Sequence, residues 1–126
     1  MGAATTGAVG RRAERRALSF LCGQGLRPIT QNFRCRGGEI DLIMLHGDCL
    51  TFVEVRYRRS SRFSSPAPTV DYRKQRKIVA TAAMFLARTP RYARHTMRFD
   101  VVAIAGDADE SVEWIQDAFR PRNSTL

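Results

Sequence analysis

Cysteines and long apolar runs are both scarce in this sequence. Cys22, Cys35 and Cys49 are its three cysteines, and they form no CxxC pair and no Cys/His group at zinc spacing. Free thiols suit a reducing compartment, so we expect a cytoplasmic protein. The longest apolar runs, such as residues 78–86, are far shorter than the roughly 20 residues that cross a bilayer, so we expect no membrane partner.

Acidic residues are outnumbered, and lysine is rare among the basic ones. The 126 residues include 21 basic and 12 acidic side chains, a net charge of +9, and Lys74 and Lys77 are the two lysines. A small domain this basic commonly binds a polyanion, because each phosphate that it neutralises releases condensed counterions. The charge favours nucleic acid as the partner, and an acidic protein is the competing interpretation.

The length fits one domain with one core, since domains most often contain about 100–150 residues. Residues 1–7 are small and polar, and we expect them to be disordered. We place a single domain at residues 8–120 and a flexible polar tail at residues 121–126. The sequence has no room for a second domain.

The hydrophobic pattern predicts an α/β fold of order αβββαβ(β), with a central mixed sheet flanked by helices. Helical spacing indicates helices at residues 8–23 and 69–88, the second capped by Thr69. Strand patterns occupy residues 28–36, 39–46, 49–58, 98–105 and, more briefly, 111–115. A Ser- and Pro-rich loop is expected at residues 59–68.

A hairpin brings two acidic residues together. Gly47 and Asp48 fit the two central positions of a type II′ turn, which requires Gly first. Asp41 then lies directly opposite Glu54. If the turn were shifted by one residue to His46 and Gly47, Asp41 would be diagonal to Glu54 but on the same face, because side chains alternate along a strand.

Two carboxylates this close require a compensating cation, since like charges directly opposite each other in a sheet are unfavourable. Arg56 could supply the charge as a structural partner, or a divalent metal could, and the spacing leaves both interpretations open. Glu14 is the one acidic residue among the first 38. It either points from its helix towards the sheet or pairs with neighbouring arginines.

Four segments occur in an order that resembles a known family: GEIDLI at residues 38–43, FVEVRYR at residues 52–58, Lys74, and RFDVV at residues 98–102. The sequence resembles the YraN-like family of small bacterial proteins. That family is similar to the restriction-endonuclease-like superfamily, and particularly to archaeal Holliday-junction resolvases. The signature of this superfamily is an acid on one strand followed by E-x-K on the next.

The resemblance implies a metal-dependent phosphodiester hydrolase. Asp41 and Glu54 match the two metal-binding acids, with the backbone carbonyl of Val55 as a further ligand of Mg²⁺ or Mn²⁺. Glu14 matches a helical glutamate near the metal. Arg56 stands where the signature has lysine, and arginine can stabilise a charged phosphate but cannot deprotonate.

The expected partner is nucleic acid, with DNA favoured, and the resemblance to resolvases implies a homodimer. The backbone phosphates would be contacted by basic residues that follow the acids, namely Arg58, Arg59, Arg62, Lys74 and Lys77. Asp100 and Arg98 are expected to form a structural ion pair. Three functions remain open: a structure-sensitive DNA endonuclease, a non-catalytic nucleic-acid-binding module, and an interaction protein with a structural acid–arginine network.

Overall fold

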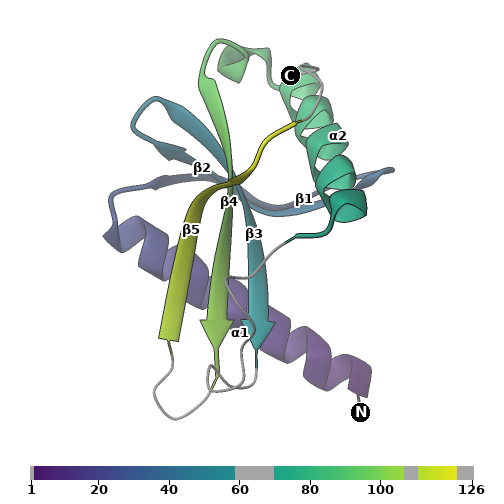
Figure 1. Cartoon of the computed structure of the whole chain (residues 1–126), viewed down its shortest axis with the longest axis vertical. Coiled ribbons are helices and arrows are strands. Elements are labelled where there is room, and N and C mark those ends of the chain that lie inside the picture. The colour runs from purple at the N-terminus through teal and green to yellow at the C-terminus, as the bar shows by residue number, and fades with distance from the viewer. Residues whose placement is uncertain (1, 59–69, 107–110, 122–126) are drawn as a thin grey trace.

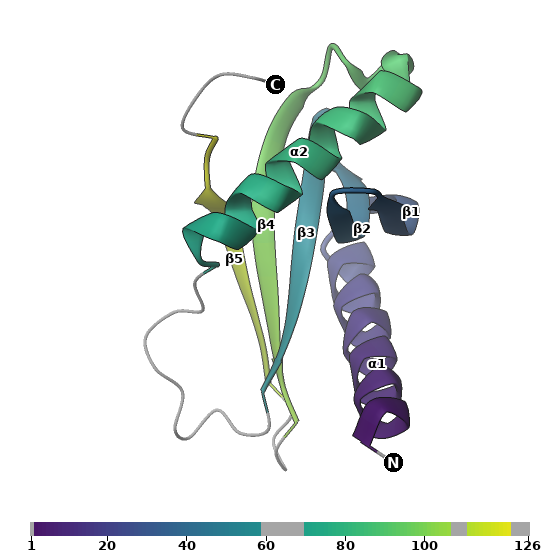
Figure 2. The same cartoon turned by 90° about the vertical axis from the view of Figure 1, so that its right-hand side faces the viewer.

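The computed structural model describes residues 2–58, 70–106 and 111–121, which form a five-stranded sheet with one long helix against each face (Figures 1 and 2). The elements are α1 (Gly2–Gly23), β1 (Arg27–Cys35), β2 (Gly38–His46), β3 (Cys49–Arg58), α2 (Tyr72–Arg88), the 3₁₀ turn η1 (Pro90–Tyr92), β4 (Thr96–Ala105) and β5 (Ser111–Phe119). The strands lie in sequence order, and β3 pairs with β4 in parallel while the other pairs are antiparallel. The predicted α/β class, mixed sheet and element order are confirmed.

Helix α1 forms because small and apolar residues recur every fourth position on the face that meets the sheet. Ala13, Ala17 and Leu21 are buried there. The helix ends in a Schellman motif: Gly25 takes φ +95°, and the N–H of Leu26 donates to the carbonyl of Leu21 at 3.0 Å. The helix begins at Gly2, so residues 2–7, which were expected to be disordered, belong to it; that stretch contains small residues and no proline.

Helix α2 begins at Tyr72 with Asp71 as its cap. The Asp71 carboxylate accepts a hydrogen bond from the backbone N–H of Lys74 at 2.9 Å. Thr69, which the sequence suggested as the cap, lies outside the described residues. The expected core stripe of Ile78, Ala82 and Phe85 is buried against the sheet. Neither helix of the described chain is long and apolar enough to cross a membrane.

The hairpin between β2 and β3 follows the predicted register. His46 faces Cys49 and Ile43 faces Phe52, with Gly47 at φ +61° as a type II′ turn requires. Alternation then divides the core into two clusters, one on each face of the sheet. Ile43 and Phe52 pack under α2, while Leu42, Met44 and Val53 pack under α1.

The hairpin departs from the prediction at Asp41. Pairing between β2 and β3 runs from His46 to Leu42, so Asp41 does not lie directly opposite Glu54. Ile40 packs in the α2 cluster beside Ile43, whereas strict alternation placed it on the α1 face with Leu42. The strand therefore turns at Asp41, where it separates from β3. Its neighbour on β1, Asn32, takes φ +51° at the same level.

The final strands are longer than their patterns suggested. β4 starts at Thr96 rather than Arg98, and β5 continues four residues beyond Ile115 to Phe119. The register of β4 with β5 shifts between Phe99 and Val101, and Phe119 stacks on Phe99 with ring centroids 5.0 Å apart. Because the pairing is irregular here, simple alternation in the sequence did not predict the end of β5.

Candidate functional site

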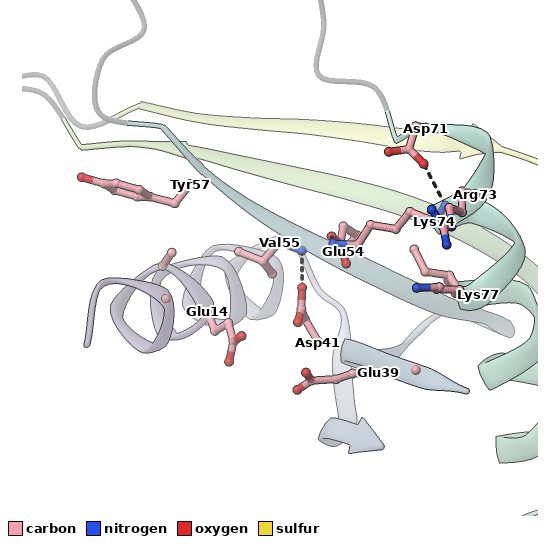
Figure 3. A pocket seen from close by; sticks show the side chains of 14 residues that line it. Glu14, Glu39, Asp41, Glu54, Val55, Tyr57, Asp71, Arg73, Lys74 and Lys77 are labelled. Atoms are coloured by element: carbon pink, nitrogen blue, oxygen red, sulfur yellow. Dashed lines mark hydrogen bonds and ion pairs between the residues drawn. The ribbon is translucent and has the colours of Figure 1, made fainter. Parts of the chain in front are cut away.

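A cavity of about 530 Å³ opens where β2 separates from β3, between α1 and the first turns of α2 (Figure 3). Four elements contribute to its lining: Glu14 from α1, Glu39 and Asp41 from β2, Glu54 from β3, and Lys74 and Lys77 from α2. The cavity therefore gathers acidic groups on the strands and basic groups on the helix that covers them.

Asp41 is held in the gap between the two strands. One of its oxygens, Oδ2, accepts a hydrogen bond from the backbone N–H of Val55 at 2.8 Å, in the place of a strand-to-strand bond. Burial, and then the negative charges of Glu54 and Glu14, raise the pKa of Asp41 to about 8. Ionisation of Asp41 would thus add a negative charge that the surrounding groups disfavour.

Glu54 is 7% exposed and its carboxylate meets Lys74. The Lys74 Nζ lies 2.7 Å from Glu54 Oε2, across the space between α2 and β3 (Figure 3). The Asp71 cap fixes the helix turn that carries this lysine. The sequence predicted Lys74 as a phosphate contact along the backbone, whereas the structure places it against a carboxylate of the cluster.

Asn32 connects Glu14 and Glu39, and the sequence did not predict this role. Its Nδ2 donates to Glu14 Oε1 at 3.0 Å and to Glu39 Oε2 at 3.1 Å, so it ties α1 to β2 beside Asp41. Asn adopts the left-handed region more readily than most residues. An Asn within a strand pattern was therefore the available signal. Glu14 itself faces the cavity, which settles the choice that its sequence position left open.

The remaining predicted residues are divided between the cavity and other parts of the chain. Arg56 and Arg58 are not among the residues that line the cavity, whereas Lys77 is. The carbonyl of Arg58 accepts a hydrogen bond from Gly106 at 2.8 Å at the end of β3. Arg59 and Arg62 lie outside the described residues. The cation that forms an ion pair with Glu54 is thus Lys74 from α2, a partner that spacing along the strand did not suggest.

The family model described as Uncharacterised protein family UPF0102 matches residues 13–104, from α1 through β4. This chain belongs to that family. The UPF0102 family is the same group as the YraN-like proteins, so that resemblance is confirmed. The chain is 44% identical over 121 residues to a UPF0102 protein of Pseudomonas putida strain GB-1, covering 94% of this chain and 98% of the relative. It is 50% identical over 112 residues to a UPF0102 protein of Pseudomonas syringae pv. syringae strain B728a, covering 87% and 91%.

The donor set of this UPF0102 protein fits a hard divalent cation. Within residues 2–58, 70–106 and 111–121, no group of three or more His, Cys, Asp or Glu side chains could hold a metal ion alone. Asp41 and Glu54 supply two carboxylates. The N–H and C=O of one strand residue point to the same side, so the Val55 carbonyl also faces the gap. Mg²⁺ commonly binds one or two carboxylates and completes its shell with water and substrate oxygens.

Proposed function

We propose that this UPF0102 protein is a metal-dependent nuclease that hydrolyses phosphodiester bonds in nucleic acid, with DNA as the favoured substrate, and that its fold is of the restriction-endonuclease-like kind. The observation that carries this proposal is the convergence of Asp41, Glu54 and Lys74 from three elements at the point where the sheet opens. A structural ion pair needs one acid and one base, whereas here a second, half-buried carboxylate is left with a strongly raised pKa.

Asp41, Glu54 and the Val55 carbonyl would hold Mg²⁺ or Mn²⁺. Bound there, the cation would polarise the phosphate and lower the pKa of a coordinated water. Asp41 is already positioned by the Val55 N–H, so its second oxygen is oriented without further ordering. Glu14, held by Asn32, adds negative charge beside Asp41 and strengthens the attraction for a cation.

Lys74 provides an amine that can exchange a proton, which Arg56 cannot do. A lysine amine beside a carboxylate can orient an attacking water and can exchange a proton, while the arginine guanidinium stays protonated. The 2.7 Å contact with Glu54 keeps the amine at the edge of the ligand set. Arg73 and Lys77 line the same cavity and carry positive charge for the substrate phosphates.

The test is cleavage of labelled linear duplex, single strand, flap and four-way junction in Mg²⁺, Mn²⁺ or EDTA. We compare the wild type with Asp41→Asn, which keeps an acceptor for the Val55 N–H, and with Asp117→Asn, which removes the same charge from an exposed position. Cutting that needs metal, survives in Asp117→Asn and falls at least about 100-fold in Asp41→Asn supports the enzyme. Equal cutting by Asp41→Asn and the wild type contradicts it.

A non-catalytic nucleic-acid-binding module is the second candidate. The ion pair between Lys74 and Glu54 favours it, because that pair already neutralises one of the two carboxylates without a metal. This candidate predicts salt-sensitive binding of nucleic acid, no cleavage by any variant, and no rise in melting temperature on addition of Mn²⁺. The nuclease predicts that Mn²⁺ raises the melting temperature of the wild type and not of Asp41→Asn.

A further inference from the structure

A second cavity, of about 420 Å³, lies on the other flank of α1. Its lining includes three arginines of the helix, Arg12, Arg15 and Arg16, together with Tyr57 near the end of β3 and Gly106 directly after β4. This arginine cavity and the carboxylate cavity share two lining residues, Ala13 and Tyr57. The two spaces are therefore adjacent, and Tyr57 stands at their junction.

The helix geometry explains why the two flanks differ in charge. Ala13 is 4% exposed and sits against the sheet, which makes it the centre of the buried stripe. Glu14, one residue later, is rotated by about 100° to one side, and Arg12, one residue earlier, by the same angle to the other. Arg16 follows Arg12 by four residues and joins its side. Within the described ranges, Arg12 and Arg15 form no ion pair with an acidic side chain, so their charge is directed to solvent.

Tyr57 is an aromatic side chain left at the surface in a fixed place. It is 42% exposed, although on the same strand face Val53 is buried under α1 and Val55 is partly buried there. A Cβ built at Gly106 would lie 2.8 Å from two carbons of its ring, so glycine is what allows the ring to lie against the backbone there. Gly106 is itself fixed by its hydrogen bond to Arg58. In Figure 3 the ring lies beside α1, away from Glu54 and Lys74.

We propose that Tyr57 stacks an unpaired base of a single-stranded segment whose phosphates are held by Arg12 and Arg15 in the arginine cavity. The inference rests on the proposed nucleic-acid function and names its substrate class. A strand that leaves the carboxylate cavity towards the arginines passes Tyr57, because that residue lines both. One face of the exposed ring lies against the backbone, and the other face is open for a base to stack on it. Stacking of this kind requires a base that is not paired in a duplex.

The charge test measures binding of a fluorescent oligothymidine in EDTA, so that cleavage plays no part. Arg12→Ala/Arg15→Ala is compared with Arg91→Ala/Arg94→Ala, a pair near η1 that loses the same charge before the start of β4, about 30 Å from Gly106 along that strand. We expect about tenfold weaker binding and a smaller salt slope for the first pair only, since each lost phosphate contact lowers the slope by about 0.7.

The stacking test uses Tyr57→Leu and Tyr57→Phe. Leucine removes the ring, and we expect binding of the single strand to weaken about tenfold with the salt slope unchanged, while phenylalanine keeps the affinity. Gly106→Ala displaces the ring without changing charge, and it should resemble Tyr57→Leu. Binding of a blunt duplex should change less than twofold in all three variants.

Three outcomes overturn the inference. The Arg12/Arg15 pair could lose no more affinity than the Arg91/Arg94 pair, or Tyr57→Leu could bind the single strand as the wild type does. Either result removes this subsite and leaves the nuclease proposal standing, because metal-dependent cleavage is measured separately. If the wild type binds neither the single strand nor the duplex in a salt-dependent way, both proposals fail together.

Discussion

Two aspartates of the sheet, Asp100, which is buried, and Asp41, which is half-buried, lie in opposite electrostatic settings. Asp100 is 1% exposed and accepts hydrogen bonds from Arg98 at 2.8 and 2.9 Å, from the Trp114 indole at 2.9 Å, and from the backbone N–H of Asp117 at 2.9 Å. Asp41 accepts a bond from the Val55 N–H and faces the carboxylate of Glu54. Asp100 has a complete internal set of donors, while Asp41 has the Val55 N–H as its donor and the like charges of Glu54 and Glu14 beside it.

The difference is that between a carboxylate with a full set of internal donors and one that we propose to be a ligand for a cation. Asp100 pins the irregular register of β4 with β5, because it accepts a hydrogen bond from the backbone N–H of Asp117, which takes φ +56°. Its partner Arg98 has a raised pKa, chiefly through their hydrogen bonds. Asp41 weakens the metal-free fold when it ionises. Under the proposed function, a bound cation would offset this cost.

Asp100→Ala should produce the largest loss of stability. The substitution leaves Arg98, whose side chain is 17% exposed, without its counter-ion and removes the acceptor of Trp114. We expect the free energy of unfolding to fall by about 3–5 kcal/mol, as measured by urea denaturation. A loss below about 1 kcal/mol would mean that Asp100 is not the structural member of the comparison.

In metal-free protein, Asp41→Asn should raise the stability of the fold, whereas Asp100→Ala lowers it. The raised pKa means that the folded state keeps its proton while the unfolded chain loses it, so the wild type loses stability as pH rises from about 4 through about 8. Asparagine does not ionise, and we expect its advantage to grow to the order of 2 kcal/mol at pH 9. Urea denaturation in EDTA at pH 5 and pH 9 measures it.

The control for this pH dependence is Asp117→Asn. Hydrogen bonds from Arg120 lower the pKa of Asp117, so removing its charge offers no gain at high pH. The free energy of unfolding of Asp41→Asn could also differ from that of the wild type by the same amount at pH 5 and pH 9. That result would show that ionisation of Asp41 does not destabilise the fold.

Lys74→Ala should make the stability of the fold depend more strongly on added metal. Glu54 then loses the amine 2.7 Å away while its neighbour Asp41 remains, and we expect a loss of about 1–2 kcal/mol in EDTA. Mn²⁺ should restore more stability to this variant than to the wild type. Lys77→Ala is the matched control, since it removes a lysine that lines the same cavity on the same helix. Equal losses in both variants would exclude a special role for Lys74.

Local signals in the sequence were sufficient for most of the fold. Alternation identified the hairpin faces and the register that pairs Ile43 with Phe52, and helical spacing identified the Ile78, Ala82 and Phe85 stripe. Each of these signals depends on neighbours along one element or across one tight turn. The Arg98–Asp100 ion pair was also predicted and is confirmed, because both residues lie on one strand two positions apart.

The site was less predictable because it depends on how separate elements pack. Nothing in GEIDLI indicates that the strand leaves its partner at Asp41, since its apolar pattern fits a continuous ladder. Arg56 follows Glu54 by two residues on the strand, which moves its Cα about 6–7 Å along β3. Lys74 lies 20 residues later in the sequence, and the packing of α2 places its amine beside the same carboxylate. Only tertiary contact shows which of the two bases is the partner.

Arg120→Ala should have the smallest effect and completes the comparison. Arg120 Nη2 lies 2.6 Å from Asp117 Oδ2, a shorter contact than the 2.8 Å between Arg98 and Asp100. Its side chain is 81% exposed, however, so water already solvates both charges and the ion pair adds little to the stability of the fold. We expect the urea midpoint to stay at the wild-type value. A shift as large as that of Lys74→Ala would mean that distance, and not burial, sets the strength of these ion pairs, and the contrast between Asp100 and Asp41 would then need another explanation.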